Sequence, residues 1–75
     1  MFKKGQKFRI LKSGDLRERG KKWVNAVVEH IPENGRFVRF RLHFVNMFGE
    51  HTSYIESFTM NELNHLMRKG DLVRR

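Results

Sequence analysis

Residues 34–45, NGRFVRFRLHFV, decide how the rest of this 75-residue chain is interpreted. The stretch begins with Asn34-Gly35, the usual pair for a type I′ turn, because both central positions of that turn need a positive φ angle. After the turn, apolar and basic side chains alternate with the period of two that is typical of a half-buried strand. The stretch therefore predicts a β-hairpin whose second strand carries arginines on one face.

The two faces of this strand differ in chemistry. Val38, Phe40, Leu42 and Phe44 point one way, and Phe37, Arg39, Arg41, His43 and Val45 point the other way. The first set predicts the core side of a sheet. The second set has two interpretations. Either the arginines are an ordinary solvated face, or they form a binding surface, because exposed apolar residues beside them are unfavourable without a partner.

Further strands are expected on both sides of this hairpin. Lys7–Lys12 alternates apolar and basic residues, which predicts a half-buried strand. In Trp23–Ile31 both alternating sets of positions are partly apolar, and a bulge or a strong bend would reconcile them. His51–Phe58 is expected to form a fourth strand, and Leu72-Val73 a short closing one. Residues 13–22 are polar, contain two glycines and predict a long exposed loop.

A helix is predicted over about residues 60–69. Thr59 and Glu62 have the spacing of a capping box, in which the threonine hydroxyl accepts from the Glu62 amide and the glutamate reaches back. Gly70 suits the left-handed position that ends a helix. One apolar stripe follows at helical spacing, and we expect it to close the core: Met60, Leu63, Leu66 and Met67.

These elements predict a single small domain over residues 1–75 in the α+β class, mainly β. The order of elements fits an SH3-like small barrel, or a strongly bent antiparallel sheet of four to five strands, with one C-terminal helix. The sequence leaves open which face of the sheet the helix covers. If it covered the arginine face, Phe37 would be buried and the binding surface would lie elsewhere.

Residues 3–31 resemble a KOW-type segment. Gly5 opens the first strand, Gly14-Asp15 and Gly20-Lys21 mark the loop, and a valine-rich strand follows. The loop is longer than that of the family, and Trp23-Val24-Asn25 has no counterpart in it. The resemblance implies an SH3-like barrel that contacts RNA, ribosomes or transcription machinery.

The charge of the chain is strongly positive and unevenly placed. Sixteen Lys and Arg residues against eight Asp and Glu residues give a formal net charge of +8. Residues 1–22 contain nine of the basic residues against Asp15 and Glu18, and residues 36–46 contain three arginines and no acid. A basic excess of this kind predicts a polyanionic partner, most often nucleic acid, although charge for solubility alone is the alternative.

The candidate contacts with nucleic acid fall into two groups. On the sheet, arginine would neutralise phosphate while aromatic rings stack on bases. In the loop, basic side chains would grip the phosphate backbone without reading sequence, unless the loop is simply a solvated segment. The sheet group contains Trp23, Arg36, Phe37, Arg39, Arg41 and His43, and the loop group contains Lys12, Arg17, Arg19, Lys21 and Lys22.

Several other functions are disfavoured by the sequence. The chain has no cysteine, and its four histidines fall on different expected elements, so we expect no metal site and no cofactor. The carboxylates show no pairing for acid–base chemistry, and no serine has the context of a nucleophile, so we expect no enzyme. No run approaches the roughly 20 apolar residues of a membrane span, and we expect a soluble cytoplasmic protein.

Two alternatives to nucleic-acid binding stay open. One is a small adaptor or inhibitor, of the kind that phages or mobile elements encode, which binds an acidic surface of a partner protein or adds a strand at a sheet edge. The other is self-association through Phe37, Val45 and Phe48, so that the protein is a monomer or a homodimer. The sequence does not distinguish DNA from RNA.

Overall fold

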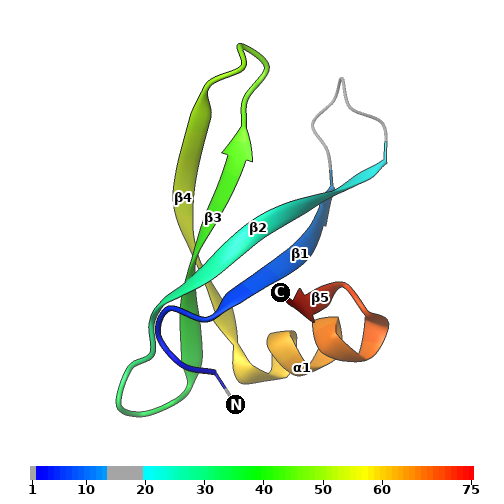
Figure 1. Ribbon diagram of the computed structural model, residues 1–75. Helices are drawn as coiled ribbons and strands as arrows, with labels where there is room; N and C mark the ends of the chain where they lie inside the picture. Colours follow the sequence, from blue (N-terminus) through cyan, green and yellow to red (C-terminus); the bar gives the residue numbers. More distant parts are fainter. Residues whose placement is uncertain (1, 14–19) are drawn as a thin grey trace.

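The computed structural model describes residues 2–13 and 20–75 and contains one antiparallel sheet with one helix (Figure 1). The strands lie side by side in the order β4-β3-β2-β1-β5. This arrangement confirms the predicted α+β, mainly β, class. In chain order the elements are β1 (Lys7–Ser13), β2 (Lys21–His30), β3 (Phe37–Val45), β4 (His51–Thr59), α1 (Met60–Lys69) and β5 (Leu72–Arg74).

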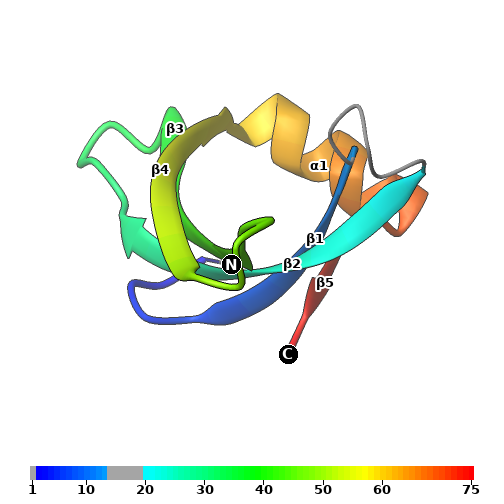
Figure 2. The same ribbon diagram turned by 90° about the horizontal axis from the view of Figure 1, so that it is seen from above.

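The sheet is strongly bent but open. β4 and β5 are its two edges and do not pair with each other, so the bent sheet is found and not the closed SH3-like barrel. Figure 2 shows the strands curving round while α1 lies across the open side. Because α1 follows β4 and precedes β5, the helix connects one edge of the sheet to the other. The sheet therefore has a concave face toward the helix and a convex face away from it.

The hydrophobic core lies between the concave face and α1. Phe40 is at its centre, where its ring meets the rings of Phe8 and Phe58 edge-on at centroid distances of 5.8 and 5.7 Å. Aromatic pairs favour this edge-to-face geometry. The helix contributes Leu63, which is fully buried. The buried side chains are Phe8, Ile10, Ala26, Val28, Val38, Phe40, Leu42, Phe58, Leu63 and Leu72.

The helix begins and ends at the predicted residues. The Glu62 amide donates to the Thr59 hydroxyl at 3.1 Å, and the Thr59 amide donates to the Glu62 carboxylate at 3.0 Å, which completes the capping box. Gly70 takes the left-handed conformation, with φ 77°, and ends the helix. The expectation for the apolar stripe is wrong at one position, because Met67 is 50% exposed.

A bulge in β2 accounts for the mixed pattern of residues 23–31, as predicted. The register between β2 and β3 shifts between Val28 and His30. Before the bulge, Ala26 and Val28 are buried while Trp23 lies on the convex side. After it, Ile31 packs against the core. One extra residue therefore lets the strand return an apolar side chain to the inside.

The turn between β2 and β3 differs from the type I′ turn expected at Asn34-Gly35. Gly35 has a positive φ of 64°, but Asn34 does not. The turn spans Pro32 to Gly35 and is closed by the Gly35 amide, which donates to the Pro32 carbonyl at 3.0 Å. Because the connection runs from residue 31 to 36 and not over two residues, it needs only one left-handed position.

Candidate nucleic-acid interface

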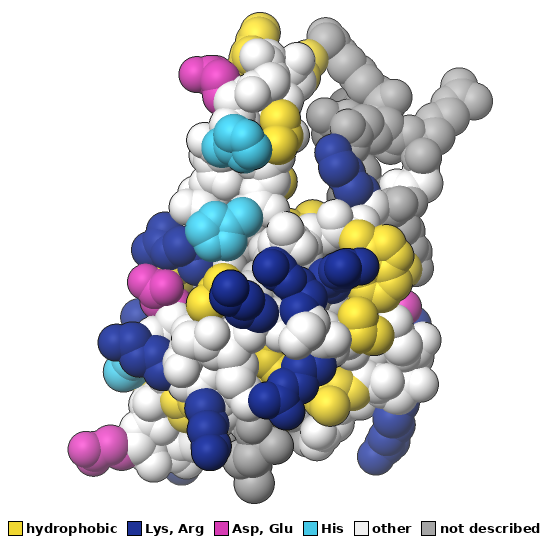
Figure 3. Space-filling view, in the orientation of Figure 1, with side chains coloured by type: hydrophobic (Ala, Val, Ile, Leu, Met, Phe, Trp, Pro, Cys, Tyr) yellow, Lys and Arg dark blue, Asp and Glu magenta, His cyan; other side chains and the backbone are white. Residues whose placement is uncertain are grey.

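The alternation of each strand separates a core face from a basic face. The convex surface of the sheet carries most of the cations that the sequence placed on the polar side of each strand. In Figure 3, Lys and Arg side chains gather over the middle of the molecule with hydrophobic side chains among them. We call this surface the basic face and define it by Lys7, Arg9, Trp23, Phe37, Arg39, Arg41 and His43.

The strand register brings these residues into rows across the sheet. Arg9 lies opposite Asn25, and Asn25 lies opposite His43. One row further along, Lys7 lies opposite Val27, which in turn lies opposite Arg41. Neighbouring strands are about 4.8 Å apart, so cations on β1 and β3 are separated by about 10 Å. The basic face is therefore built from residues that are far apart in the sequence.

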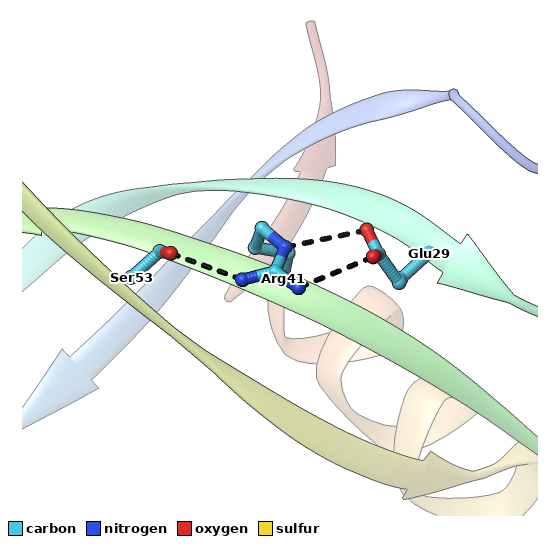
Figure 4. Close-up of polar contacts among 3 residues, drawn as sticks. All are labelled: Glu29, Arg41 and Ser53. Carbon is cyan, nitrogen blue, oxygen red and sulfur yellow. Dashed lines mark hydrogen bonds and ion pairs between the residues drawn. The ribbon is translucent and has the colours of Figure 1, made fainter.

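Arg41 lies at the middle of the basic face and is held by two neighbouring strands (Figure 4). Its guanidinium donates to both carboxylate oxygens of Glu29, at 3.4 Å from Nε and 3.2 Å from Nη2. The remaining nitrogen, Nη1, donates to the Ser53 hydroxyl at 3.1 Å. A bidentate guanidinium–carboxylate pair fixes the orientation of the arginine. Arg41 is thus positioned, and its charge is largely balanced by Glu29.

Glu29 is the one acidic side chain among the described strand residues of the convex face. The Arg41 guanidinium, which donates hydrogen bonds to the Glu29 carboxylate, holds the pKa of Glu29 below its ordinary value. Glu29 lies on the convex face because side chains alternate along β2 and its neighbour Val28 is buried on the concave side. Glu29 therefore stays ionised at neutral pH and lowers the net charge of the basic face.

The other cations of the basic face are not balanced in this way. Lys7, Arg9 and Arg39 form no ion pair with any residue in ranges 2–13 and 20–75. Arg39 instead lies over the Phe37 ring, 5.8 Å from its centroid, which is the geometry of a cation–π contact. This contact leaves the positive charge of Arg39 available to an anion. These three residues carry the uncompensated charge of the basic face.

Exposed apolar side chains lie beside these cations. Trp23 is 46% exposed and lies opposite Leu11, two pairs before the end of the β1–β2 ladder. On the same face, Val73 lies opposite Arg9 and Ile55 lies opposite Arg41. Aromatic and aliphatic surfaces interleaved with cations suit a ligand that has both planar rings and negative charge.

Lys12 lies on the opposite side of the sheet from the basic face. Its ammonium is 3.0 Å from both carboxylate oxygens of Glu56 and lies 5.7 Å from the centroid of the Phe58 ring. Because Lys12 belongs to β1 and Glu56 to β4, this ion pair spans the concave side. Lys12 therefore joins two strands that do not pair with each other, and it does not belong to the basic face.

The remaining predicted residues are placed as follows. Arg36 is exposed in the connection before β3, and Lys22 is exposed in β2 opposite Lys12. Arg17 and Arg19 lie outside the described residues, and so does the side chain of Lys21, although its backbone belongs to β2. Among the described residues, no group of three or more His, Cys, Asp or Glu side chains is arranged to hold a metal ion.

Sequence reasoning missed Lys7 and Arg9 as members of the candidate site. Both fell on the polar side of a predicted strand, so their direction was available from the period of two. What was missing was the pairing of β1 with β2, which brings Arg9 beside Asn25 and therefore close to His43. If the two strands on either side of the 13–22 segment had been paired antiparallel, Lys7 and Arg9 would have been predicted to lie on the same face as the β3 arginines.

The chain matched no protein-family model, no curated protein and no solved structure. In the part of the chain that the structure describes, no helix is long and apolar enough to cross a membrane.

Proposed function

We propose that this protein is a non-enzymatic domain that binds single-stranded nucleic acid, DNA or RNA, on its basic face. The observation that carries the proposal is the uncompensated charge of Lys7, Arg9 and Arg39 on the same surface as the exposed Trp23. This combination is the one that single-strand binding uses, because cations neutralise phosphates while exposed rings stack on unpaired bases.

The geometry also indicates how the ligand would lie. A strand running across β1, β2 and β3 would meet Arg9 first and His43 later, in the row that the register defines. Arg41 would act as a fixed positive edge and not as a mobile clamp, since Glu29 and Ser53 hold it. A duplex has no unpaired base for Trp23 and would contact only the cations.

The proposal also places the protein in the cytoplasm.

The test is a titration that follows the fluorescence of Trp23, the single tryptophan of the chain. Single-stranded DNA, RNA of the same sequence and duplex DNA are added in turn, at low salt and at about 0.15 M salt, where the Debye length is about 8 Å. We expect a fluorescence change with single strands that persists at the higher salt. The proposal is wrong if all three ligands lose binding there, or if duplex DNA binds as tightly as the single strands.

A second candidate function is binding to a partner protein through the tip of the β3–β4 hairpin. Phe48 is 79% exposed and Met47 is 60% exposed there, and Asn46 orders the turn by accepting from the Phe48 and Glu50 amides at 2.9 and 3.0 Å. A well-ordered turn that presents an aromatic side chain resembles the anchors of protein interfaces. Loss of partner capture in Phe48→Ala, with nucleic-acid binding unchanged, would favour this candidate.

A further inference from the structure

The outer edge of β4 is long and unprotected. β4 pairs only with β3, and its other side has no neighbouring strand in the sheet. It extends over nine residues, whereas β5 at the opposite edge has three. Natural proteins usually protect such an edge with lysine, proline, a bulge or a short strand. The sequence HTSYIESFT has no lysine and no proline, and the register with β3 is regular along its whole length.

The backbone groups of β4 that face this open edge can be identified. The Asn46 amide donates to the Glu50 carbonyl at 2.9 Å, and the Met60 amide donates to the Arg36 carbonyl at 3.4 Å. Both contacts join even-numbered residues at the two ends of the β3–β4 ladder. Because hydrogen-bonded and non-hydrogen-bonded pairs alternate in an antiparallel ladder, residues 53, 55 and 57 direct their N–H and C=O groups outward.

We propose that a second copy of this chain pairs with this edge, antiparallel and centred on Ile55. In this register Ile55 faces the same residue of the other copy, and Ser53 faces Ser57. Ser53, Ile55 and Ser57 would then exchange their outward backbone hydrogen bonds with the other copy. The two sheets would become one continuous sheet across a two-fold axis, which is the closed symmetry most common among soluble oligomers.

The side chains of β4 are compatible with this pairing on both faces. No pair in this register brings like charges together, because Tyr54 faces Glu56 and the convex positions are serine, isoleucine, histidine and threonine. Two exposed apolar side chains would be covered, Ile55 on the convex face and Tyr54 on the concave face, which are 41% and 40% exposed in the single chain. Cross-strand pairs of this kind stabilise sheets.

The pairing also has a consequence for the ligand. β4 itself carries no lysine or arginine, and the cations of the basic face lie on β1 and β3. Joining two β4 edges would place two basic faces on one surface with a neutral strip between them. The consequence for nucleic acid, a doubled contact length, rests on the proposed function, whereas the pairing does not.

The test is the mass of the protein in solution, measured by sedimentation equilibrium at about 0.15 M salt and at higher salt. We expect a species of twice 9.1 kDa, about 18 kDa, whose fraction rises with salt because each chain carries a net charge of +8. Ile55→Lys and Ile55→Glu each place like charges face to face, so each variant should have the monomer mass. An equimolar mixture of the two variants should recover the dimer mass.

Val73→Lys is the matched control, because Val73 is also about two-fifths exposed on the convex face but belongs to the opposite edge. It should keep the wild-type mass, and circular dichroism checks that every variant is folded. Amide hydrogen exchange of the wild type adds a test that needs no variant: Ser53, Ile55 and Ser57 should exchange more slowly as protein concentration rises. A monomer at all salt and protein concentrations overturns the proposal, and so does a dimer that persists in Ile55→Lys.

The measurements distinguish a failure of the β4 edge pairing from a failure of the proposed nucleic-acid binding. Dimerisation should strengthen as salt rises, whereas binding of a polyanion should weaken. A monomeric Ile55→Lys that still binds single-stranded nucleic acid would separate the two properties. A wild-type protein that is dimeric but does not bind would leave the edge pairing intact and refute the basic face.

Discussion

Arg41 is at the centre of the basic face, yet its guanidinium is already engaged by Glu29 and Ser53. An ion pair between solvent-exposed side chains adds little to stability, so the main effect of this pair is to fix the Arg41 side chain and to balance its charge. The residue that limits the positive potential of the surface is therefore Glu29. Removing the charge of Glu29 tests directly whether the positive electrostatic potential beside Arg41 affects the binding of nucleic acid.

We expect Glu29→Gln to bind single-stranded nucleic acid more tightly than the wild type, by roughly three- to tenfold, because Arg41 becomes available to a phosphate. Fluorescence titration of Trp23 measures the change. Glu33→Gln is the matched control, since Glu33 is exposed in the β2–β3 connection and its replacement changes the net charge equally. Equal effects of the two substitutions on binding would show that the affinity depends only on the total charge of the protein and not on the charge beside Arg41.

The same residue predicts a pH dependence of stability. The pKa of Glu29 is lowered in the folded protein, first by its hydrogen bond to Arg41, from a reference of 4.5. A lowered carboxyl pKa contributes stability above the unfolded value, and this contribution is lost as pH falls through the folded value. We expect Glu29→Gln to lose less stability than the wild type on acidification below about pH 4.5. Urea unfolding over a pH series measures this, and parallel curves would contradict it.

At the scale of elements, the cap of α1 holds the helix that closes the concave side. Thr59→Ala removes the side-chain acceptor of the Glu62 amide and should lower the free energy of unfolding by about 1 kcal/mol. It should raise the lowered pKa of Glu62 only in part, because the larger cause, the hydrogen bond from the backbone amide of residue 59, remains after the substitution. Asn61→Ala, an exposed position without a capping role, is the control for urea unfolding. Equal stability of the two variants would contradict the role of the cap.

Local chemistry explains which elements could be predicted. The period of two in β3 identified both faces of that strand, and the Thr59–Glu62 spacing identified the start of α1. The turn at Asn34 was wrong because the type I′ pattern assumes a two-residue connection, and the length of a connection depends on where both strands end. Alternation along β2 puts Glu29 on the face opposite Val28, but its contact with Arg41 depends on the pairing of β2 with β3, which no local pattern specifies.

At the scale of the whole molecule, long-range placement explains what the sequence could not indicate. Lys12 and Arg9 are close in the chain and both basic, but alternation along β1 puts them on opposite faces. The curvature of the sheet then brings Lys12 to Glu56, a residue 44 positions away. No local pattern contains that contact. The helix covers the concave face and not the arginine face because its apolar stripe meets the apolar positions of β1 and β3.

The measurement that tests the basic face most directly is the salt dependence of binding to a single strand in three proteins. For single-stranded nucleic acid, the slope of log K against log salt falls by about 0.7 for each phosphate contact that is lost. We expect the double variant Arg9→Ala/Arg39→Ala to bind more weakly and to have a slope shallower by about 1.4 than the wild type. Arg68→Ala, which removes one cation from the last turn of α1, should leave the slope close to the wild-type value. The basic face is not the binding surface if the double variant keeps the wild-type slope. The same conclusion follows if Arg68→Ala makes the slope as much shallower, for each cation removed, as the double variant does.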